Sequence, residues 1–355
     1  MSVLGLARPE LLTMAPYSSA RMEAAGGDIW LNANESPWNP IELGRINRYP
    51  EPQPPQLLAA LASLYGVEIS HLFVGRGSDE PIDLLTRAFC RAGIDSVLIA
   101  PPTFGMYAVA AQVQGAKQRT VLLRPEAGFA LDPDAILAAV DASTRIVYAC
   151  TPNNPTGNST DPALLLALAE RLHDRALLVV DEAYIEFSSR DSLVTRAGSP
   201  DNLVVLRTLS KAHGLAGVRI GTAIAAPEVI GLLRRIMAPY PLPEPSTAAA
   251  MLALSPDHQR LTQERIAQVC SERERMRLAL PDYAGVREIL PSEANFLAVR
   301  FDDPERRYRQ LAQAGVIVRK LMKYPGLDDA LRISIGTPDE NNAVLAAFAA
   351  DREVA

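Results

Sequence analysis

Lys211 is the residue of this chain whose surroundings most favour chemistry. It lies in the polar, glycine-containing run 207–221, directly after the apolar stretch 203–206. A protonated lysine is no nucleophile, but burial at the end of a strand disfavours the charged form and favours the neutral amine. A neutral amine can form a Schiff base with an aldehyde. The alternative interpretation is a solvated surface lysine in a glycine-rich loop.

The same run also carries side chains of the types that bind phosphate. These side chains are Thr208, Ser210 and Arg219. An aldehyde and a phosphate on one small molecule indicate pyridoxal phosphate (PLP). The run therefore predicts a PLP site, and the other strand ends of the chain must supply the rest of it.

Polar groups follow two of the apolar stretches. Asp181 ends the stretch 177–180, where a carboxylate can pair with the protonated nitrogen of a pyridine ring. Its alternative role is an N-cap. Tyr184 is placed to donate to the ring's 3′-oxygen, or it is a half-buried core tyrosine. The stiff turn 151–157 presents Asn154 for the same oxygen, although such a turn also occurs without a ligand.

Two further loops complete the expected site. Glycines in the loop 75–80 let the backbone of Gly77, Ser78 and Asp79 approach a phosphate at the start of a helix. This loop is neither a dinucleotide fingerprint nor a P-loop. After the stretch 97–100, Tyr107 and Phe104 compete to stack on the pyridine face, and each is also a candidate for the core.

The composition excludes several classes of protein. The formal net charge of −6 does not favour nucleic acid as a partner, and no apolar run approaches the ~20 residues of a membrane span. The sequence shows no signal segment at its N-terminus and no metal-binding pattern. Its three cysteines are widely spaced, which favours a reduced, cytoplasmic setting.

Short apolar runs alternate with amphipathic helical patterns as far as about residue 240. This alternation predicts an α/β domain with a mostly parallel sheet flanked by helices. A proline-rich cluster at 239–245 reads as a linker, and a long charged helix is expected from 257 to 280. Beyond it, strands are expected at 295–301, 316–319 and 331–335, with a helix at 340–350. We therefore expect an arm (1–29), a large domain (30–240) and a smaller α+β domain (241–355) that packs with the arm.

Taken together, these segments resemble the class I/II aminotransferase family of PLP-dependent enzymes, which have the transferase fold type I. The resemblance rests on the turn 153–157, the Asp-Glu-Ala-Tyr segment 181–184 and the Ser-Lys…Arg run 210–219. Within the family, the histidinol-phosphate aminotransferase group is most similar. Its further matches are Tyr17, 31–35, 48–51 and Arg332.

The resemblance implies a role for each matched position. Lys211 would be the Schiff-base lysine, Asp181 the partner of the pyridine nitrogen, and Tyr107, in preference to Phe104, the stacking aromatic. Asn154 and Tyr184 would contact the 3′-oxygen. The phosphate would be held by Gly77, Ser78, Asp79, Thr208, Ser210 and Arg219, with Tyr49 supplied by the neighbouring subunit of a homodimer with shared active sites. The substrate would be bound by Tyr17, Asn32, Asn154, Asn295, Arg319 and Arg332.

The implied reaction transfers an amino group from L-histidinol phosphate to 2-oxoglutarate, giving imidazole-acetol phosphate and L-glutamate in histidine biosynthesis. Lys211 would be the general acid–base, and Arg332 would bind the anions of both half-reactions. The alternatives are an aromatic amino-acid aminotransferase, a threonine-phosphate decarboxylase, and a transcription regulator, which would need a DNA-binding extension. The chain departs from the usual pattern at 36–38, 213–214 and 242–246.

Overall fold

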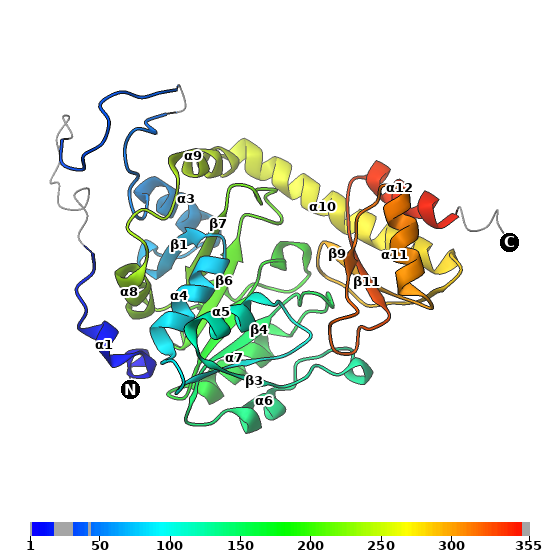
Figure 1. The fold of residues 1–355 in the computed structure, drawn as a ribbon, viewed down its shortest axis with the longest axis horizontal. Helices are drawn as coiled ribbons and strands as arrows, with labels where there is room; N and C mark the ends of the chain where they lie inside the picture. Colours follow the sequence, from blue (N-terminus) through cyan, green and yellow to red (C-terminus); the bar gives the residue numbers. More distant parts are fainter. Residues whose placement is uncertain (1, 18–30, 42–43, 350–355) are drawn as a thin grey trace.

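The large sheet of the protein carries the predicted site. The computed structural model describes residues 2–17, 31–41 and 44–349. Within these residues a seven-stranded sheet has the order β1-β7-β6-β5-β4-β2-β3, and a second sheet has four strands (Figure 1). The strands of the large sheet are β1 (Leu72–Arg76), β2 (Ser96–Ile99), β3 (Lys117–Thr120), β4 (Thr144–Cys150), β5 (Leu177–Asp181), β6 (Leu203–Thr208) and β7 (Ile220–Ile224).

The large sheet is mostly parallel, as predicted. Strands β3, β2, β4, β5 and β6 run parallel to one another, whereas β7 runs antiparallel to both of its neighbours, β6 and β1. Every residue of β5 and of β6 is buried, which explains why these strands read as continuous apolar runs rather than alternating ones.

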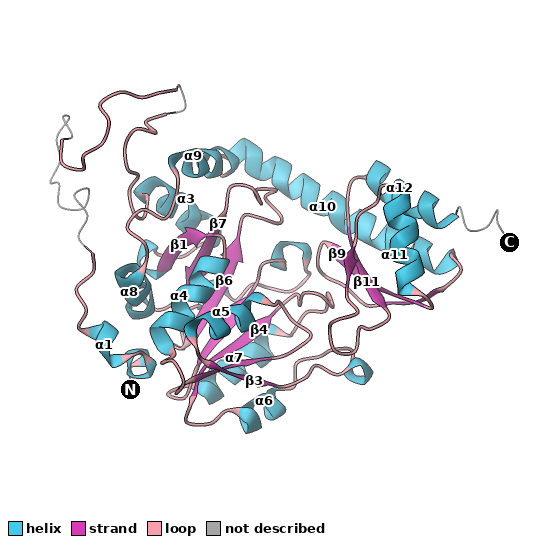
Figure 2. Ribbon diagram, in the orientation of Figure 1, coloured by secondary structure: helices cyan, strands magenta, loops and turns pink. Residues whose placement is uncertain are grey.

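Helices cover both faces of this sheet (Figure 2). One face carries α3 (Pro55–Tyr65), α6 (Pro133–Ala139), α7 (Pro162–Leu172) and α9 (Glu244–Ala253). The other carries α4 (Asp79–Phe89), α5 (Met106–Gln114) and α8 (Pro227–Ile236), with the short N-terminal helices η1 (Val3–Leu6) and α1 (Pro9–Leu12) beside α8. Asp161 caps the N-terminus of α7, since its side chain accepts a hydrogen bond from the Ala163 N–H.

The long helix α10 (Pro256–Ala279) leads from the large domain to a small one (Figure 1). The small sheet is antiparallel, in the order β10-β11-β9-β8, and packs with two helices and the C-terminal part of α10 around its own core. Its elements are β8 (Val286–Ile289), β9 (Phe296–Phe301), α11 (Pro304–Gln313), β10 (Arg319–Lys320), β11 (Ala330–Ser334) and α12 (Pro338–Ala349). The strand expected at 316–319 begins only at Arg319.

The ends of the large domain differ from the expectation. Leu242, Ala250 and Leu254 belong to the core under the large sheet, so this domain continues past residue 240. Val3 and Leu6 pack in the core on the other face of the same sheet, not against the small domain. The expected end of the arm, at residue 29, lies outside the described residues.

No helix among the described residues is long and apolar enough to cross a lipid bilayer.

Candidate active site

The carboxyl ends of the parallel strands open into one pocket. Strand β5 ends at Asp181, β4 at Cys150 and β6 at Thr208, and all three residues line the pocket. In open α/β sheets ligands bind at this edge, beyond the carboxyl ends of the strands. The pocket is lined by Ser78, Asp79, Phe104, Cys150, Asn154, Asp181, Ala183, Tyr184, Thr208, Ser210, Lys211 and Arg219.

Lys211 follows β6, and its amine faces the pocket. Its Nζ lies 5.4 Å from the centre of the Tyr184 ring. Although the side chain is open to the pocket, the surrounding protein lowers the pKa of the amine, and the positive charge of Arg332 lowers it further. The sequence predicted a desolvated amine at this position, and the direction of this shift agrees with it.

Asp181 presents a buried carboxylate with two hydrogen-bond donors. Its Oδ2 accepts from the Tyr107 hydroxyl at 2.6 Å, and its Oδ1 accepts from the Ala183 N–H at 3.1 Å. Burial raises the pKa of Asp181, and both of these donors act in the opposite direction. A cationic ring nitrogen at this carboxylate would remove the cost of burying an unpaired negative charge.

Asn154 links the two domains at the pocket. Its amide donates to the Tyr184 hydroxyl at 3.3 Å, and its Oδ1 accepts from Nη1 of Arg332, which reaches in from β11. The preceding residue, Asn153, is buried and donates to the Pro102 carbonyl at 2.9 Å. The turn is therefore held from inside, and the Asn154 side chain has a defined position.

The cationic end of the pocket is built from three backbone segments in close contact. Arg219, with φ at +59°, pairs with Asp79 at the start of α4 at 2.9 Å. Its carbonyl accepts from the Gly77 N–H at 2.9 Å. Gly77 has a φ of +71°, which favours glycine, and a Cβ there would lie 2.5 Å from the Arg219 guanidinium, which would have to shift. On the third segment, the Thr208 hydroxyl donates to Ser210 Oγ at 3.0 Å.

This donor set fits PLP. An amine for the aldehyde, a carboxylate for the pyridine nitrogen, and an amide and a phenol for the ring oxygen all line one pocket. At its other end, a guanidinium, two hydroxyls and the N-terminus of an eleven-residue helix suit a phosphate.

The expectation that Tyr107 stacks on the cofactor ring is wrong. Tyr107 is completely buried, and its ring stacks on Tyr148 with the centroids 4.5 Å apart. Phe104, the other candidate for the stacking aromatic, lines the pocket instead of Tyr107. Both side chains follow β2, and the first turn of α5 points Tyr107 inward, behind Asp181. Local sequence could not separate the two.

Seven other expected residues are not among the described lining residues, although two of them, Gly77 and Arg332, form hydrogen bonds to residues that are. Tyr17 is 63% exposed and borders a separate hollow with Arg8 and Met14. Tyr49 is 48% exposed, and its ring stacks on Tyr240. The others are Asn32, Asn295 and Arg319, of which Arg319 lies opposite Arg332 in the small sheet. Their assignment to the substrate, or to the phosphate in a neighbouring subunit, stays a prediction.

The sequence reasoning missed Cys150 and Ala183. Cys150 is the last residue of β4 and lies opposite Asp181 in the strand register. The rule that singled out Asp181, a residue at the carboxyl end of a parallel strand, applies equally to Cys150. Burial raises the pKa of its thiol, which keeps it protonated at neutral pH. Ala183 contributes its backbone N–H, which residue type does not reveal.

Comparisons with known proteins point in one direction. The sequence pattern of the family described as "Aminotransferase class I and II" matches residues 30–348. The histidinol-phosphate aminotransferase of Stenotrophomonas maltophilia is 50% identical over 99% of this chain and 98% of its own length. That of Xylella fastidiosa is 49% identical over 97% and 96%. The structure of histidinol-phosphate aminotransferase from Sinorhizobium meliloti, in complex with pyridoxal-5′-phosphate, is similar with a TM-score of 0.78 and 26% identity, covering 91% of this chain and 90% of that one.

Proposed function

Because this chain belongs to the class I and II aminotransferase family, we propose that it is the PLP-dependent enzyme that transfers the amino group of L-histidinol phosphate to 2-oxoglutarate. The observation that supports this most is the single pocket that joins a lysine with a lowered pKa to a group of residues suited to phosphate, with Arg332 of the small domain bonded to the lining residue Asn154. Relatives that share about half of their residues with this chain, over nearly its full length, are named histidinol-phosphate aminotransferase.

Each lining residue has one task in this reaction. PLP, when bound, supplies an electron sink for the bond that breaks at the amine-bearing carbon of the substrate. With PLP bound, Lys211 Nζ, with its lowered pKa, would take the proton from that carbon and, as the general acid, return it to the carbon of the cofactor that carried the aldehyde. Asp181 would hold the ring nitrogen, Asn154 and Tyr184 would hold the ring oxygen, and Phe104 would contact the face of the ring. The hydroxyls of Thr208 and Ser210, with Arg219, would hold the phosphate.

The substrate follows from the anion that Arg332 can bind. Histidinol phosphate has no α-carboxylate, but its phosphate can occupy the place that a carboxylate of glutamate takes in the other half-reaction. A guanidinium suits both, since its fork of N–H donors matches both oxyanions. Arg332 Nη1 already lies within hydrogen-bond reach of Asn154, while its Nε is buried without a partner.

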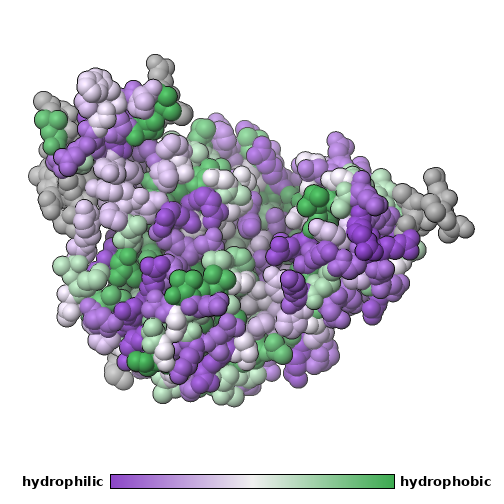
Figure 3. Space-filling model, viewed as in Figure 1, coloured by the Kyte–Doolittle hydropathy of each residue, from purple (hydrophilic) through white to green (hydrophobic). Residues whose placement is uncertain are grey.

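The same proposal includes a homodimer with shared sites. A second groove adjoins the phosphate end, shares Asp79 and Arg219 with it, and is bordered by the exposed side chains of Val109 and Val113 on α5. Figure 3 shows apolar atoms gathered over α5. A second copy of this chain would cover this surface and bring its own Tyr49 to the phosphate. The three thiols, all in described residues and all free, fit a cytoplasmic enzyme.

The deciding experiment compares substrates for the purified, PLP-loaded enzyme. Histidinol phosphate, phenylalanine and threonine phosphate are each offered with 2-oxoglutarate, and the products are identified. We expect kcat/KM to be highest for histidinol phosphate, with formation of glutamate and no release of carbon dioxide. Turnover confined to the aromatic amino acid, or carbon dioxide from threonine phosphate, would replace the proposal with one of those activities.

A further inference from the structure

The hydrogen bond between Tyr107 and Asp181 is built into the core and has no place yet in the proposed reaction. The Tyr107 hydroxyl donates to Asp181 Oδ2 at 2.6 Å, a short distance typical of a donor to an ionised carboxylate. Both side chains are shielded from solvent, with Tyr107 completely buried and Asp181 2% exposed. Little water reaches this carboxylate, so the loss of a donor would not be made good by solvent.

The ring of Tyr107 is itself held rigidly. It lies parallel to the ring of Tyr148, with an interplanar angle of 4°, and meets Phe104 edge-on with the centroids 5.6 Å apart. The hydroxyl of Tyr148 points elsewhere, within 3.0 Å of Thr86 Oγ1 and 3.3 Å of the Ile82 carbonyl. Two neighbouring buried tyrosines thus have similar packing, and only one touches Asp181.

We propose that Tyr107 is a positioning residue that keeps Asp181 ionised and aimed at the ring nitrogen of PLP. This proposal rests on the role assigned above to Asp181. It gives Tyr107 a function different from ring stacking, which Phe104 takes over. The two residues, three positions apart on one loop and helix, then act on the face and on the nitrogen of the same ring.

The physical basis is the cost of burying a negative charge. Burial raises the pKa of Asp181, while the Tyr107 hydroxyl lowers it, with the Ala183 N–H as the second donor. Without the hydroxyl, the pKa rises further and the carboxylate takes up a proton at higher pH. The other titratable groups that face this pair are the Cys150 thiol, the phenols of Tyr148 and Tyr184 and, more distantly, Asp79 and Lys211. None of them donates to Oδ2 in place of Tyr107.

The test compares Tyr107→Phe with Tyr148→Phe, each of which removes one buried hydroxyl from the same ring stack. Apoprotein is titrated, without any amine substrate, with PLP and with 1-deaza-PLP, whose ring has carbon in place of the nitrogen. The dissociation constant of 1-deaza-PLP divided by that of PLP reports how much the contact between the ring nitrogen and Asp181 strengthens binding. We expect Tyr107→Phe to reduce this ratio roughly tenfold or more, as a lost hydrogen bond to a charged group implies. The ratio also falls on acidification, as Asp181 takes up a proton, and in Tyr107→Phe this fall should occur at higher pH. Tyr148→Phe should leave both unchanged.

A second variant keeps the fold intact. 3-Fluorotyrosine at position 107 retains the ring and the hydroxyl but makes the hydroxyl a better donor, so the ratio should increase. The proposal is overturned if Tyr107→Phe weakens PLP and its deaza analogue by the same factor, if Tyr148→Phe has the same effect, or if 3-fluorotyrosine leaves the ratio unchanged. A wrong choice of amine substrate would show only in the substrate comparison, because no substrate is present here.

Discussion

At the scale of single residues, the reactivity of Lys211 is a property of its neighbours. Burial by the surrounding protein is the larger cause of the lowered pKa of the amine, and the positive charge of the Arg332 guanidinium lowers it further. Arg332 lies over the Phe296 ring, with 5.1 Å from Cζ to the ring centroid, and is fixed there by its bond to Asn154. One arginine therefore has two effects, on the anion of the substrate and on the amine of the lysine.

Arg332→Ala should lower kcat/KM roughly tenfold to a hundredfold for both the amino donor and 2-oxoglutarate, since each loses a charge-assisted hydrogen bond. The kcat/KM of Arg332→Lys should lie between those of the wild type and Arg332→Ala, because lysine keeps the charge but lacks the fork of donors. Steady-state kinetics of both half-reactions provide the measurement. A loss confined to one of the two substrates would show that the two anions do not share Arg332.

At the scale of elements, the phosphate end depends on how closely β7 approaches the loop after β1. Gly221, in β7, lies opposite Gly75 and against the backbone of Gly77 and Ser78. A Cβ at position 221 would lie 2.3 Å from the Gly77 carbonyl carbon and from the Ser78 nitrogen. Neither is a side-chain atom that can rotate away, so the loop itself would have to move.

Gly221→Ala should therefore weaken PLP binding and lower the free energy of unfolding by about 1–3 kcal/mol, the usual cost of overpacking. Gly217→Ala is the matched control, because its Cβ would meet nothing within 4 Å. Equilibrium titration of apoprotein with PLP and denaturant unfolding measure the two effects. PLP affinity equal to that of Gly217→Ala would mean that the close approach of β7 does not shape the phosphate end.

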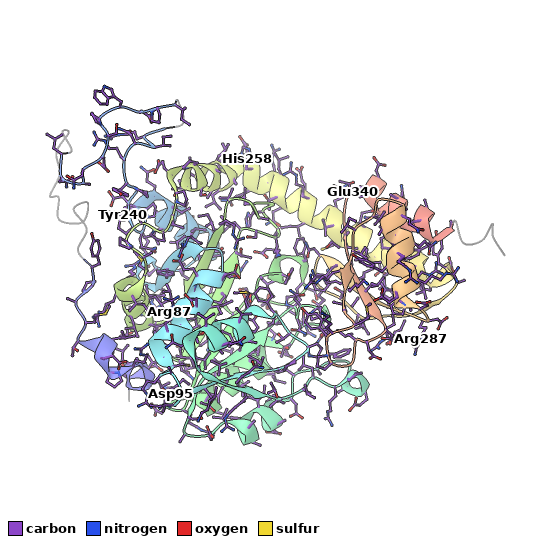
Figure 4. The ribbon with its side chains drawn as sticks, in the orientation of Figure 1. Arg87, Asp95, Tyr240, His258, Arg287 and Glu340 are labelled. Carbon is purple, nitrogen blue, oxygen red and sulfur yellow. The ribbon has the colours of Figure 1, made fainter. Side chains whose placement is uncertain are left out.

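At the scale of the whole molecule, the pocket is closed by contacts between the two domains. Besides the bond from Arg332 to Asn154, the Gly157 carbonyl in the same turn accepts from the Glu293 N–H at 2.8 Å. The Tyr184 ring meets the Phe296 ring edge-on. On the other side of the large domain, Tyr49 stacks on Tyr240, at the opposite end of the molecule from Glu340 of the small domain (Figure 4).

A hybrid dimer tests the proposal that Tyr49 acts on a partner's site. Lys211→Ala and Tyr49→Ala subunits are co-expressed with different tags, and the hybrid is purified. If the sites are shared, one of the two carries both defects and the other none, so the hybrid should have about half of the wild-type activity. A Lys211→Ala subunit paired with a wild-type one is the positive control. Activity equal to half that of the Tyr49→Ala homodimer would instead place the action of Tyr49 within its own subunit.

The sequence by itself determined the class of fold and much of the pocket. Parallel strands buried on both faces must be continuously apolar, so the runs that became β4, β5 and β6 were visible, and so were the polar residues at their ends. Asp181, Asn154, Tyr184 and Lys211 were found this way, because strand ends of one parallel sheet meet at one edge.

The tertiary structure decided what depends on side-chain direction and on contacts far apart in sequence. Phe104 and Tyr107 follow the same strand, and only the packing of Tyr107 against Tyr148 shows which of the two faces the pocket. The end of the large domain was equally hidden, because Leu242 lies in the proline-rich cluster that reads as a linker. Only the structure shows that Leu242 and Leu254 belong to the core under the large sheet. The spacing of apolar residues indicates whether one segment is a helix or a strand. The direction of a side chain and the domain to which a segment belongs depend on its neighbours in space.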